Sequence, residues 1–242
     1  MLGADVAAGA LAPLLGPRAL RAYPAILSTE AEATAWARAG APAGAVVVAA
    51  YQASPRGRGG LPWTCAPERS LGFSLVLRPA PDEGRDGWLY LVAAAALAER
   101  LDAPEFAWPD EVGTGDGGLG ARVAVGAAGE PGPGGWAVLS CLIEGACPPR
   151  GLLLAGVVAA VESWGTRPTA DVVDAARAHC TTLGRRVRAR MVPLGPRGTV
   201  VTGTAVDLDA AGALVIEGDD GRRRVVPPAG VGALDLADTN AW

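Results

Sequence analysis

The residues with the clearest chemical potential lie between Gln52 and Trp63, where the sequence reads QASPRGRGGLPW. Arg56 and Arg58 alternate with glycines in this stretch. A guanidinium supplies several donors in a rigid fork, and glycine lets the backbone approach an anion closely. The stretch therefore has the composition of a phosphate-binding loop, although a solvated basic connector between two strands has the same composition.

Other groups that could do chemistry are sparse. The cysteines form no CxxC pair and show no metal-ligand spacing, and the chain has a single histidine. These residues leave little for a zinc site. We expect the cysteines to be buried, reduced thiols of a cytoplasmic protein. The residues concerned are Cys65, Cys141, Cys147, Cys180 and His179.

The composition limits the class of protein. The chain has 242 residues, 50% of them hydrophobic, so it can bury a large core in one or two domains. Its formal net charge of −4 disfavours a general nucleic-acid binder, and one Arg-Gly copy without interleaved aromatics disfavours an RNA-binding repeat. All 21 basic residues are arginine. The apolar runs are too short for a membrane span and the N-terminus has no export pattern, so we expect no membrane partner.

Local patterns predict alternating helices and strands. Thr29 and Glu32 have the spacing of a capping box and Gly40 suits a C-terminal cap, which together predict a helix over 28–40. Apolar runs on either side of the Arg-Gly stretch predict two strands of one sheet, which this stretch connects. Further helices are expected over 88–101, 151–164 and 169–180, and strands over 45–51, 71–79, 121–125 and 136–144.

The sequence changes character near Thr182–Gly184. Beyond this point, short strand-like segments are separated by tight turns at Asp209–Gly212 and Asp219–Gly221. Several short strands within about 55 residues predict a small barrel or sandwich. We therefore expect two domains, residues 1–182 and residues 183–242.

Four stretches together resemble the biotin–protein ligase catalytic family. Residues 28–30 read Ser-Thr-Glu where the family has Ser-Thr-Asn, so Glu30 replaces the asparagine. Residues 52–63 follow the family's Q-T-x-G-R-G-R-x-G-R-x-W, and residues 108–111 read WPDE where it has W-P-N-D. Residues 179–188, HCTTLGRRVR, are similar to its T-L-G-x-x-V entry into a C-terminal barrel. The resemblance extends over nearly the whole chain.

This resemblance implies an α/β (α+β) fold, with a mixed sheet, helices packed on one side, and a small C-terminal SH3-like barrel. It implies an enzyme that adenylates biotin with ATP and Mg²⁺, then transfers the biotinyl group to a lysine on the biotin carboxyl-carrier domain of a carboxylase. Too few residues precede the match for a helix-turn-helix, so we expect no DNA-binding domain. The matching ligand-binding positions are Ser28, Thr29, Gln52, Arg56, Gly57, Arg58, Gly60, Trp63 and Trp108.

Some positions depart from the family pattern in ways that affect charge. Ala107 and Gly118 stand at or near two lysine positions of the family, and Arg122 is a candidate substitute cation. Asp110 and Glu111 replace an Asn-Asp pair and are candidate Mg²⁺ ligands. Arginine would have replaced lysine without loss of charge, so these changes predict weaker binding of a triphosphate.

Other departures concern backbone and shape. Pro55 and Leu61 stand where the Arg-Gly loop of the family has glycine and arginine, and the segment LSCLIEG lacks the asparagine of its G-x-G-x-N-V strand. Two alternatives to an active ligase therefore stay open. One is a weak or inactive paralogue that binds a biotin-like ligand or a carrier partner. The other is a lipoate- or octanoyl-handling relative.

Overall fold

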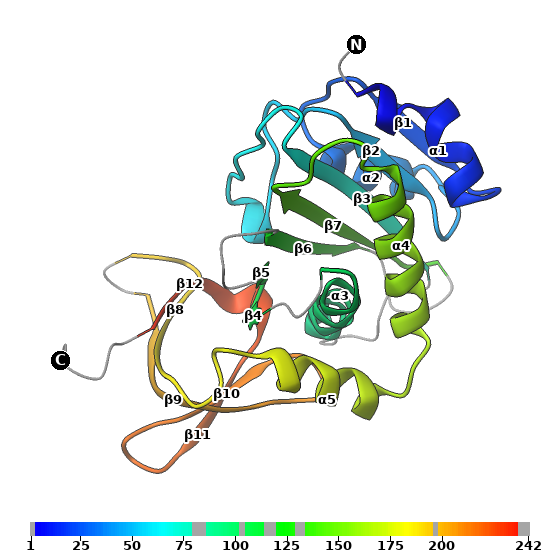
Figure 1. Ribbon diagram of the computed structural model, residues 1–242. Coiled ribbons are helices and arrows are strands. Elements are labelled where there is room, and N and C mark those ends of the chain that lie inside the picture. The colour runs from blue at the N-terminus through cyan, green and yellow to red at the C-terminus, as the bar shows by residue number, and fades with distance from the viewer. Residues whose placement is uncertain are drawn as a thin grey trace.

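The computed structural model describes residues 3–78, 86–101, 105–113, 120–128, 134–195 and 198–236. Within these ranges the chain forms a seven-stranded sheet followed by a five-stranded sheet. Figure 1 shows helices α3 and α4 in front of the first sheet and the second sheet at the opposite end of the molecule from the N-terminus. The mixed α/β fold predicted from the sequence is confirmed.

The first sheet has the order β1-β2-β3-β7-β6-β5-β4. Strands β1 and β2 pair in parallel, and the other neighbours pair antiparallel, so the sheet is mixed. The strands span Leu20–Tyr23 (β1), Val46–Ala49 (β2), Ser70–Leu77 (β3), Glu105–Ala107 (β4), Glu111–Gly113 (β5), Gly120–Ala128 (β6) and Trp136–Glu144 (β7).

Alternation along the strands gives the first sheet two different faces. Val46 and Val48 of β2 pack in the same apolar cluster as α3 and α4, whereas Val47 packs with Ala33 and Ala37 of α2. The expected one-sided packing therefore holds for α3 and α4, while α2 covers part of the other face. The helices span Ala8–Leu15 (α1), Thr29–Arg38 (α2), Asp86–Arg100 (α3), Gly151–Gly165 (α4) and Thr169–His179 (α5).

The second sheet is antiparallel with the order β11-β10-β9-β8-β12. It packs closely against the first unit. A Cβ on Gly212 would collide with the Gly87 carbonyl at the start of α3, and its φ of +83 also favours glycine. The strands span Arg186–Met191 (β8), Val200–Leu208 (β9), Leu214–Glu217 (β10), Arg223–Val226 (β11) and Val231–Leu236 (β12).

One apolar cluster runs from the first sheet into the second. It includes Phe73 of β3 and Leu97 of α3, together with Leu214 and Val231 of the second sheet. The division at residues 182 and 183 stays a prediction, because the two sheets share this cluster and β8 begins at Arg186.

Several local expectations need correction. Helix α2 is capped by Ser28, whose Oγ accepts from the Ala31 amide at 3.3 Å, one residue before the predicted cap. Glu32 instead accepts from Tyr23 and Arg21. Of the cysteines expected to be buried, only Cys141 is fully buried, Cys65 and Cys180 are half-buried, and Cys147 is exposed. No helix in the described ranges is long and apolar enough to cross a membrane.

Candidate functional site

The candidate ligand surface is the sheet face opposite α3 and α4. Ser74 of β3 pairs with Ser140 of β7, and Ala124 of β6 pairs with Ser140 from the other side. Two residues further along the strands, and so on the same face, Gly72 pairs with Leu142. Residues at matching registers project to the same side of a sheet, so the centre of this face carries two serines beside an alanine, a glycine and a leucine.

Three hydroxyl groups form a chain across this face. Ser74 Oγ donates to Thr29 Oγ1 at 3.0 Å, and Ser74 Oγ lies 2.8 Å from Ser140 Oγ. A serine hydroxyl has one hydrogen, so Ser140 is the donor to Ser74. Thr29 then keeps its own hydroxyl hydrogen for another acceptor. We call Thr29, Ser74 and Ser140 the hydroxyl floor, and all three side chains are buried.

Gln52 joins the hydroxyl floor from the neighbouring loop. Its Oε1 accepts from the Thr29 backbone amide at 2.7 Å. A Cβ on Gly72 would collide with Gln52 Nε2, so the carboxamide lies directly against the sheet where glycine leaves room. The predicted residues Ser28, Thr29 and Gln52 therefore come together in space.

Trp63 forms an apolar wall beside the hydroxyl floor. It packs with Ala124 and Leu142 of the sheet face. A Cβ on Gly57 would collide with the Trp63 indole. Gly57 therefore leaves room for Trp63, a role that its place in an Arg-Gly motif did not indicate.

The Arg-Gly loop uses most of its amides internally. The amides of Gly57 and Trp63 donate to Leu61 and Pro55 carbonyls at 2.7 and 3.0 Å, and the Gly60 amide donates to the Gly57 carbonyl at 3.0 Å. Arg56 is exposed, and its Nη1 donates to the Gly60 carbonyl at 3.3 Å. In this conformation these amides and Arg56 bind the loop itself, and anion binding by Arg56, Gly57, Arg58 and Gly60 stays a prediction.

Arg58 differs from Arg56 because only 8% of it is exposed. Its Nη1 donates to the carbonyls of Pro228 and Val231 in the C-terminal segment. Its Nε lies 3.2 Å from Asp110 Oδ2, an ion pair by distance without hydrogen-bond alignment. Burial raises the pKa of the Asp110 carboxyl, and the Arg58 charge opposes that shift. An anion could engage Nη1 or Nε of Arg58 only if these contacts broke.

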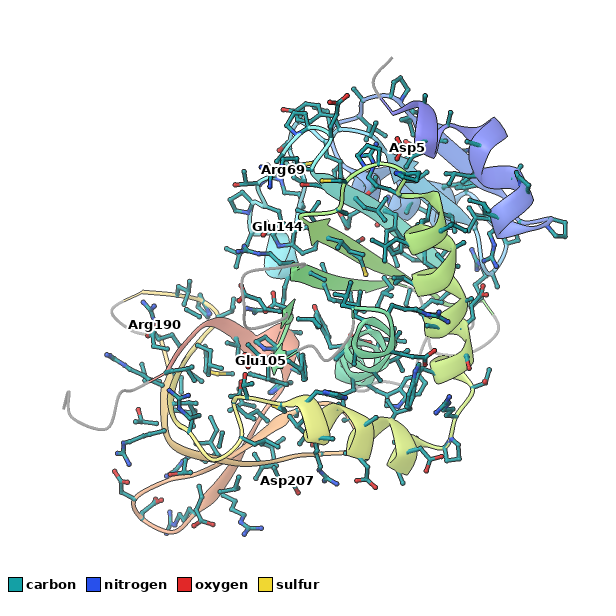
Figure 2. The ribbon with its side chains drawn as sticks, in the orientation of Figure 1. Asp5, Arg69, Glu105, Glu144, Arg190 and Asp207 are labelled. Atoms are coloured by element: carbon teal, nitrogen blue, oxygen red, sulfur yellow. The ribbon has the colours of Figure 1, made fainter. Side chains whose placement is uncertain are left out.

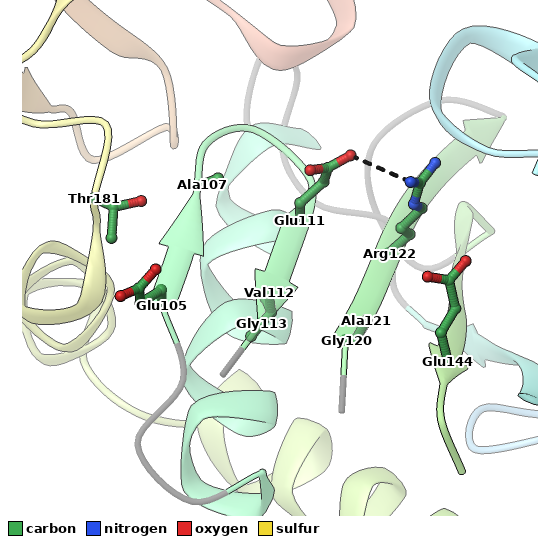
Figure 3. Close-up of a pocket in the computed structure, with 10 residues that line it drawn as sticks. All are labelled: Glu105, Ala107, Glu111, Val112, Gly113, Gly120, Ala121, Arg122, Glu144 and Thr181. Atoms are coloured by element: carbon green, nitrogen blue, oxygen red, sulfur yellow. Dashed lines mark ion pairs between the residues drawn. The ribbon is translucent and has the colours of Figure 1, made fainter. Parts of the chain in front are cut away.

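A shallow pocket of about 240 Å³ continues the same face toward β4 (Figure 3). Ala107 pairs with Glu111, which in turn pairs with Arg122. Arg122 Nη2 lies 3.8 Å from Glu111 Oε1, and Arg122 is the cation among the lining residues that the structure describes. Ala107 offers only a methyl group there, and Gly118 lies outside the described residues. The lining residues are Glu105, Ala107, Glu111, Val112, Gly113, Gly120, Ala121, Arg122, Glu144 and Thr181.

Trp108 and Asp110 both contact other protein groups at the junction between the two sheets. The Trp108 indole donates to the Gly212 carbonyl, and its amide donates to Thr182 Oγ1, both at 3.0 Å. Asp110 faces Arg58, whereas Glu111 faces Arg122, so the two candidate Mg²⁺ ligands have separate partners. In the part of the chain that the structure describes, no group of three or more potential ligands is arranged for a metal ion.

Comparison with known proteins addresses both parts of the chain. Residues 182–230 match the family model for the biotin protein ligase C terminal domain. A biotin protein ligase from Aquifex aeolicus, solved with biotin and ATP, is similar over 90% of this chain and 99% of its own, with 18% identity and a TM-score of 0.67. The chain has the biotin protein ligase fold, and its residues 182–230 match the C-terminal domain model of that family.

Other structures with the biotin protein ligase fold are similar to a comparable degree. A Helicobacter pylori biotin acetyl coenzyme A carboxylase synthetase, solved with biotinylated ATP, has 17% identity and a TM-score of 0.62, covering 87% of this chain and 99% of its own. A biotin protein ligase-like protein of unknown function from Silicibacter sp. has 15% identity and a TM-score of 0.66, covering 89% and 96%. A search of curated protein sequences gave no match.

Within this biotin protein ligase fold, sequence motifs found some of the candidate site and missed the rest. Thr29, Gln52 and Trp63 lie on or beside one face, and Ser28 caps α2 directly before Thr29. Ligand binding by these residues, which the resemblance implied, stays a prediction. Ser74 was not found, since a single serine within an apolar strand gives no motif. Its partnership with Ser140 depends on strand register, which the sequence does not state.

Proposed function

We propose that this protein binds biotin or a closely related acyl ligand on the hydroxyl floor, and adenylates it weakly or not at all. The observation that carries the proposal is that the arginines around the site are paired with other protein groups and that one expected lysine position is neutral. Arg58 is engaged by Asp110 and two carbonyls, Arg122 faces Glu111, and Ala107 is neutral. The similar structures solved with biotin and ATP support the ligand class.

The hydroxyl floor and Gln52 suit the polar end of such a ligand. The ureido group of biotin has one carbonyl acceptor and two N–H donors, which match hydroxyl and carboxamide groups. Thr29 has a hydrogen available for the carbonyl, and Ser140 Oγ has lone pairs available for an N–H. Trp63 and Leu142 supply apolar surface for the ring carbons. A binding site of this kind needs few polar groups if they are well placed.

Adenylation makes a greater electrostatic demand. The carboxylate of the ligand must approach the α-phosphate of ATP, and both anions need cationic or N–H donors. Loss of one such donor typically lowers the rate by about 10²–10³-fold. Asp110 and Glu111 would hold Mg²⁺ with ATP only after leaving Arg58 and Arg122.

An active ligase is the second candidate, with a carboxylase carrier domain as partner. The Arg122–Glu111 pair favours it, because a separation of 3.8 Å and side chains 42% and 58% exposed leave Arg122 free to turn toward a substrate. A lipoate- or octanoyl-handling protein would have less use for the hydroxyl floor, since those acyl chains have no ureido group. The free cysteines fit a reducing compartment such as the cytoplasm.

Calorimetric titration with biotin, lipoate and octanoate tests the proposal. We expect biotin to bind most tightly, and Thr29→Val to weaken it about tenfold by removing one hydrogen bond from a buried site. Thr202→Val on the exposed face of β9 is the matched control and should leave the affinity unchanged. Equal affinity of wild type and Thr29→Val, or tighter binding of octanoate than of biotin, would contradict the proposed site.

A further inference from the structure

Two arginines of one loop have opposite surroundings. Arg56 is exposed and contacts its own loop, whereas Arg58 is buried and contacts residues about 170 positions away in the sequence. Burial of a guanidinium is unfavourable unless its charge and donors are matched. The groups that bond to the Arg58 guanidinium and neutralise it therefore indicate the role of this side chain in the folded protein.

The partners of Arg58 belong to two other segments. The carbonyls of Pro228 and Val231 flank the short turn that leads into β12, the edge strand of the second sheet. Asp110, in the turn between β4 and β5, supplies the compensating charge. Arg58 thus links the Arg-Gly loop, the β4–β5 turn and the C-terminal sheet. Its Nη1 is used by the two carbonyls and its Nε faces Asp110, so an incoming anion would meet only Nη2 without a change in these contacts.

The loop itself is a compact unit. The amides of Gly57, Gly60, Leu61 and Trp63 all bond to carbonyls within residues 55–61. The Trp63 indole lies over Gly57 and also packs on the sheet face. Movement of the loop would therefore carry Trp63 away from the candidate ligand surface as one piece.

We propose that Arg58 is a positioning residue that fastens residues 55–63 to the C-terminal sheet, so that the loop opens only when Arg58 leaves Pro228 and Val231. The C-terminal sheet thereby controls the position of the Trp63 wall. This role does not depend on the identity of the ligand. It also separates Arg58 from Arg56, which is placed to meet an anion without disturbing the second sheet.

Hydrogen exchange of the full-length protein, measured by mass spectrometry, tests this role. Arg58→Met keeps much of the apolar stem and removes every donor. We expect exchange in residues 55–63 and in residues 226–234 to become about tenfold faster together, because charge-assisted hydrogen bonds are lost from both segments. Exchange in β7 and α3 should stay at the wild-type rate. Arg56→Met is the matched control and should change neither segment.

A conservative replacement separates positioning from a general loss of stability. Arg58→Lys keeps one charge without the planar fork, so it should restore part of the protection in both segments. If Arg58→Met does not fold, Arg58→Met with Asp110→Asn removes the stranded carboxylate and permits the same comparison.

Two hydrogen-exchange results would contradict the positioning role of Arg58. Exchange in residues 55–63 at the wild-type rate in folded Arg58→Met, or in the double variant, would overturn the proposal. So would inorganic tripolyphosphate slowing exchange in residues 55–63 of wild type but not of Arg58→Met, with residues 226–234 unaffected in both. That pattern would make Arg58 an anion ligand.

Discussion

Ser74 Oγ lies 2.8 Å from Ser140 Oγ across two neighbouring strands, and both side chains are buried. The Ser74 hydroxyl also donates to Thr29 Oγ1, so Ser74 of β3 links helix α2 to Ser140 of strand β7. Buried hydroxyl groups are usually retained only where partners satisfy them. Here the partners satisfy each other, and Thr29 at the end of the chain keeps its own hydroxyl hydrogen for another acceptor.

Ser74→Ala should destabilise the protein, because it leaves Thr29 and Ser140 without their shared partner. The expected loss is about 1–3 kcal/mol in the free energy of unfolding, measured by urea denaturation. Ser163→Ala on the exposed side of α4 is the control and should be within about 0.5 kcal/mol of wild type. No difference between the two variants would contradict the bonded chain.

The buried pair of Asp5 and Arg150 should make stability depend on acid pH. Hydrogen bonds from Arg150 lower the pKa of the Asp5 carboxyl from 3.8 to about 2. Because the folded value lies below the unfolded one, the contribution of about 2 kcal/mol is complete above about pH 5 and is lost progressively as pH falls through 3.8 toward 2. Asp5 lies far from Arg190 and Asp207 of the second sheet (Figure 2), so Asp5→Asn should remove this dependence without affecting that sheet.

Gly57→Ala should displace Trp63. The backbone of Gly57, with φ −104, accepts any residue, so the cost comes from collision with the indole. We expect a loss of about 1–3 kcal/mol in stability, a shift in tryptophan fluorescence and weaker binding of biotin. Gly9→Ala in α1, where an added Cβ meets nothing within 4 Å, is the control. An unchanged fluorescence spectrum in Gly57→Ala would contradict the packing described.

The cysteines should differ in reactivity toward a thiol reagent. Cys147 is exposed, whereas burial raises the pKa of the Cys141 thiol to about 12. The thiolate is the reactive form, so Cys147 should react first and Cys141 only after unfolding. Cys147→Ser should remove the fast phase of labelling. A fast phase that persists in this variant would mean that another cysteine is accessible.

Charge restored at the two positions where the resemblance implies lysines should strengthen ATP binding. Ala107→Lys together with Gly118→Lys would place two cations at positions where the resemblance implies lysines. We expect ATP to bind at least tenfold more tightly to the double variant, measured by calorimetry with Mg²⁺ present. Ala107→Leu with Gly118→Ala is the control for added volume. If the lysine variant binds ATP no better than wild type, the assignment of these two positions is wrong.

Motifs and periodicity were sufficient for the long elements but not for the short ones. The helices near residues 88–101 and 151–164 have long apolar stretches, and the structure places helices there. Strands β4 and β5 have three residues each and are separated only by residues 108–110, so they are too short to show a periodic pattern. Strand β12 was missed because Val231–Leu236 includes two small residues and a charge.

The same contrast applies to the candidate site. Site residues that are adjacent in the sequence, such as Ser28 and Thr29, were predicted from a short motif. The roles of Gly57 and Arg58 depend on Trp63 and on carbonyls near Val231, which only the tertiary structure brings together. Charge and glycine content predicted an anion loop, whereas packing gives each of these residues a partner inside the protein.

Biotin-dependent exchange of pyrophosphate into ATP is the most direct test of the central claim. The reaction requires reversible formation of an adenylate, so it reports the chemistry without a carrier domain. With biotin at a concentration that saturates the calorimetric binding curve, we predict exchange at the background without protein or far below the rate of an ordinary biotin protein ligase. Exchange at the rate of an ordinary biotin protein ligase would contradict the account, because Arg58, Arg122 and Ala107 would then suffice for adenylation.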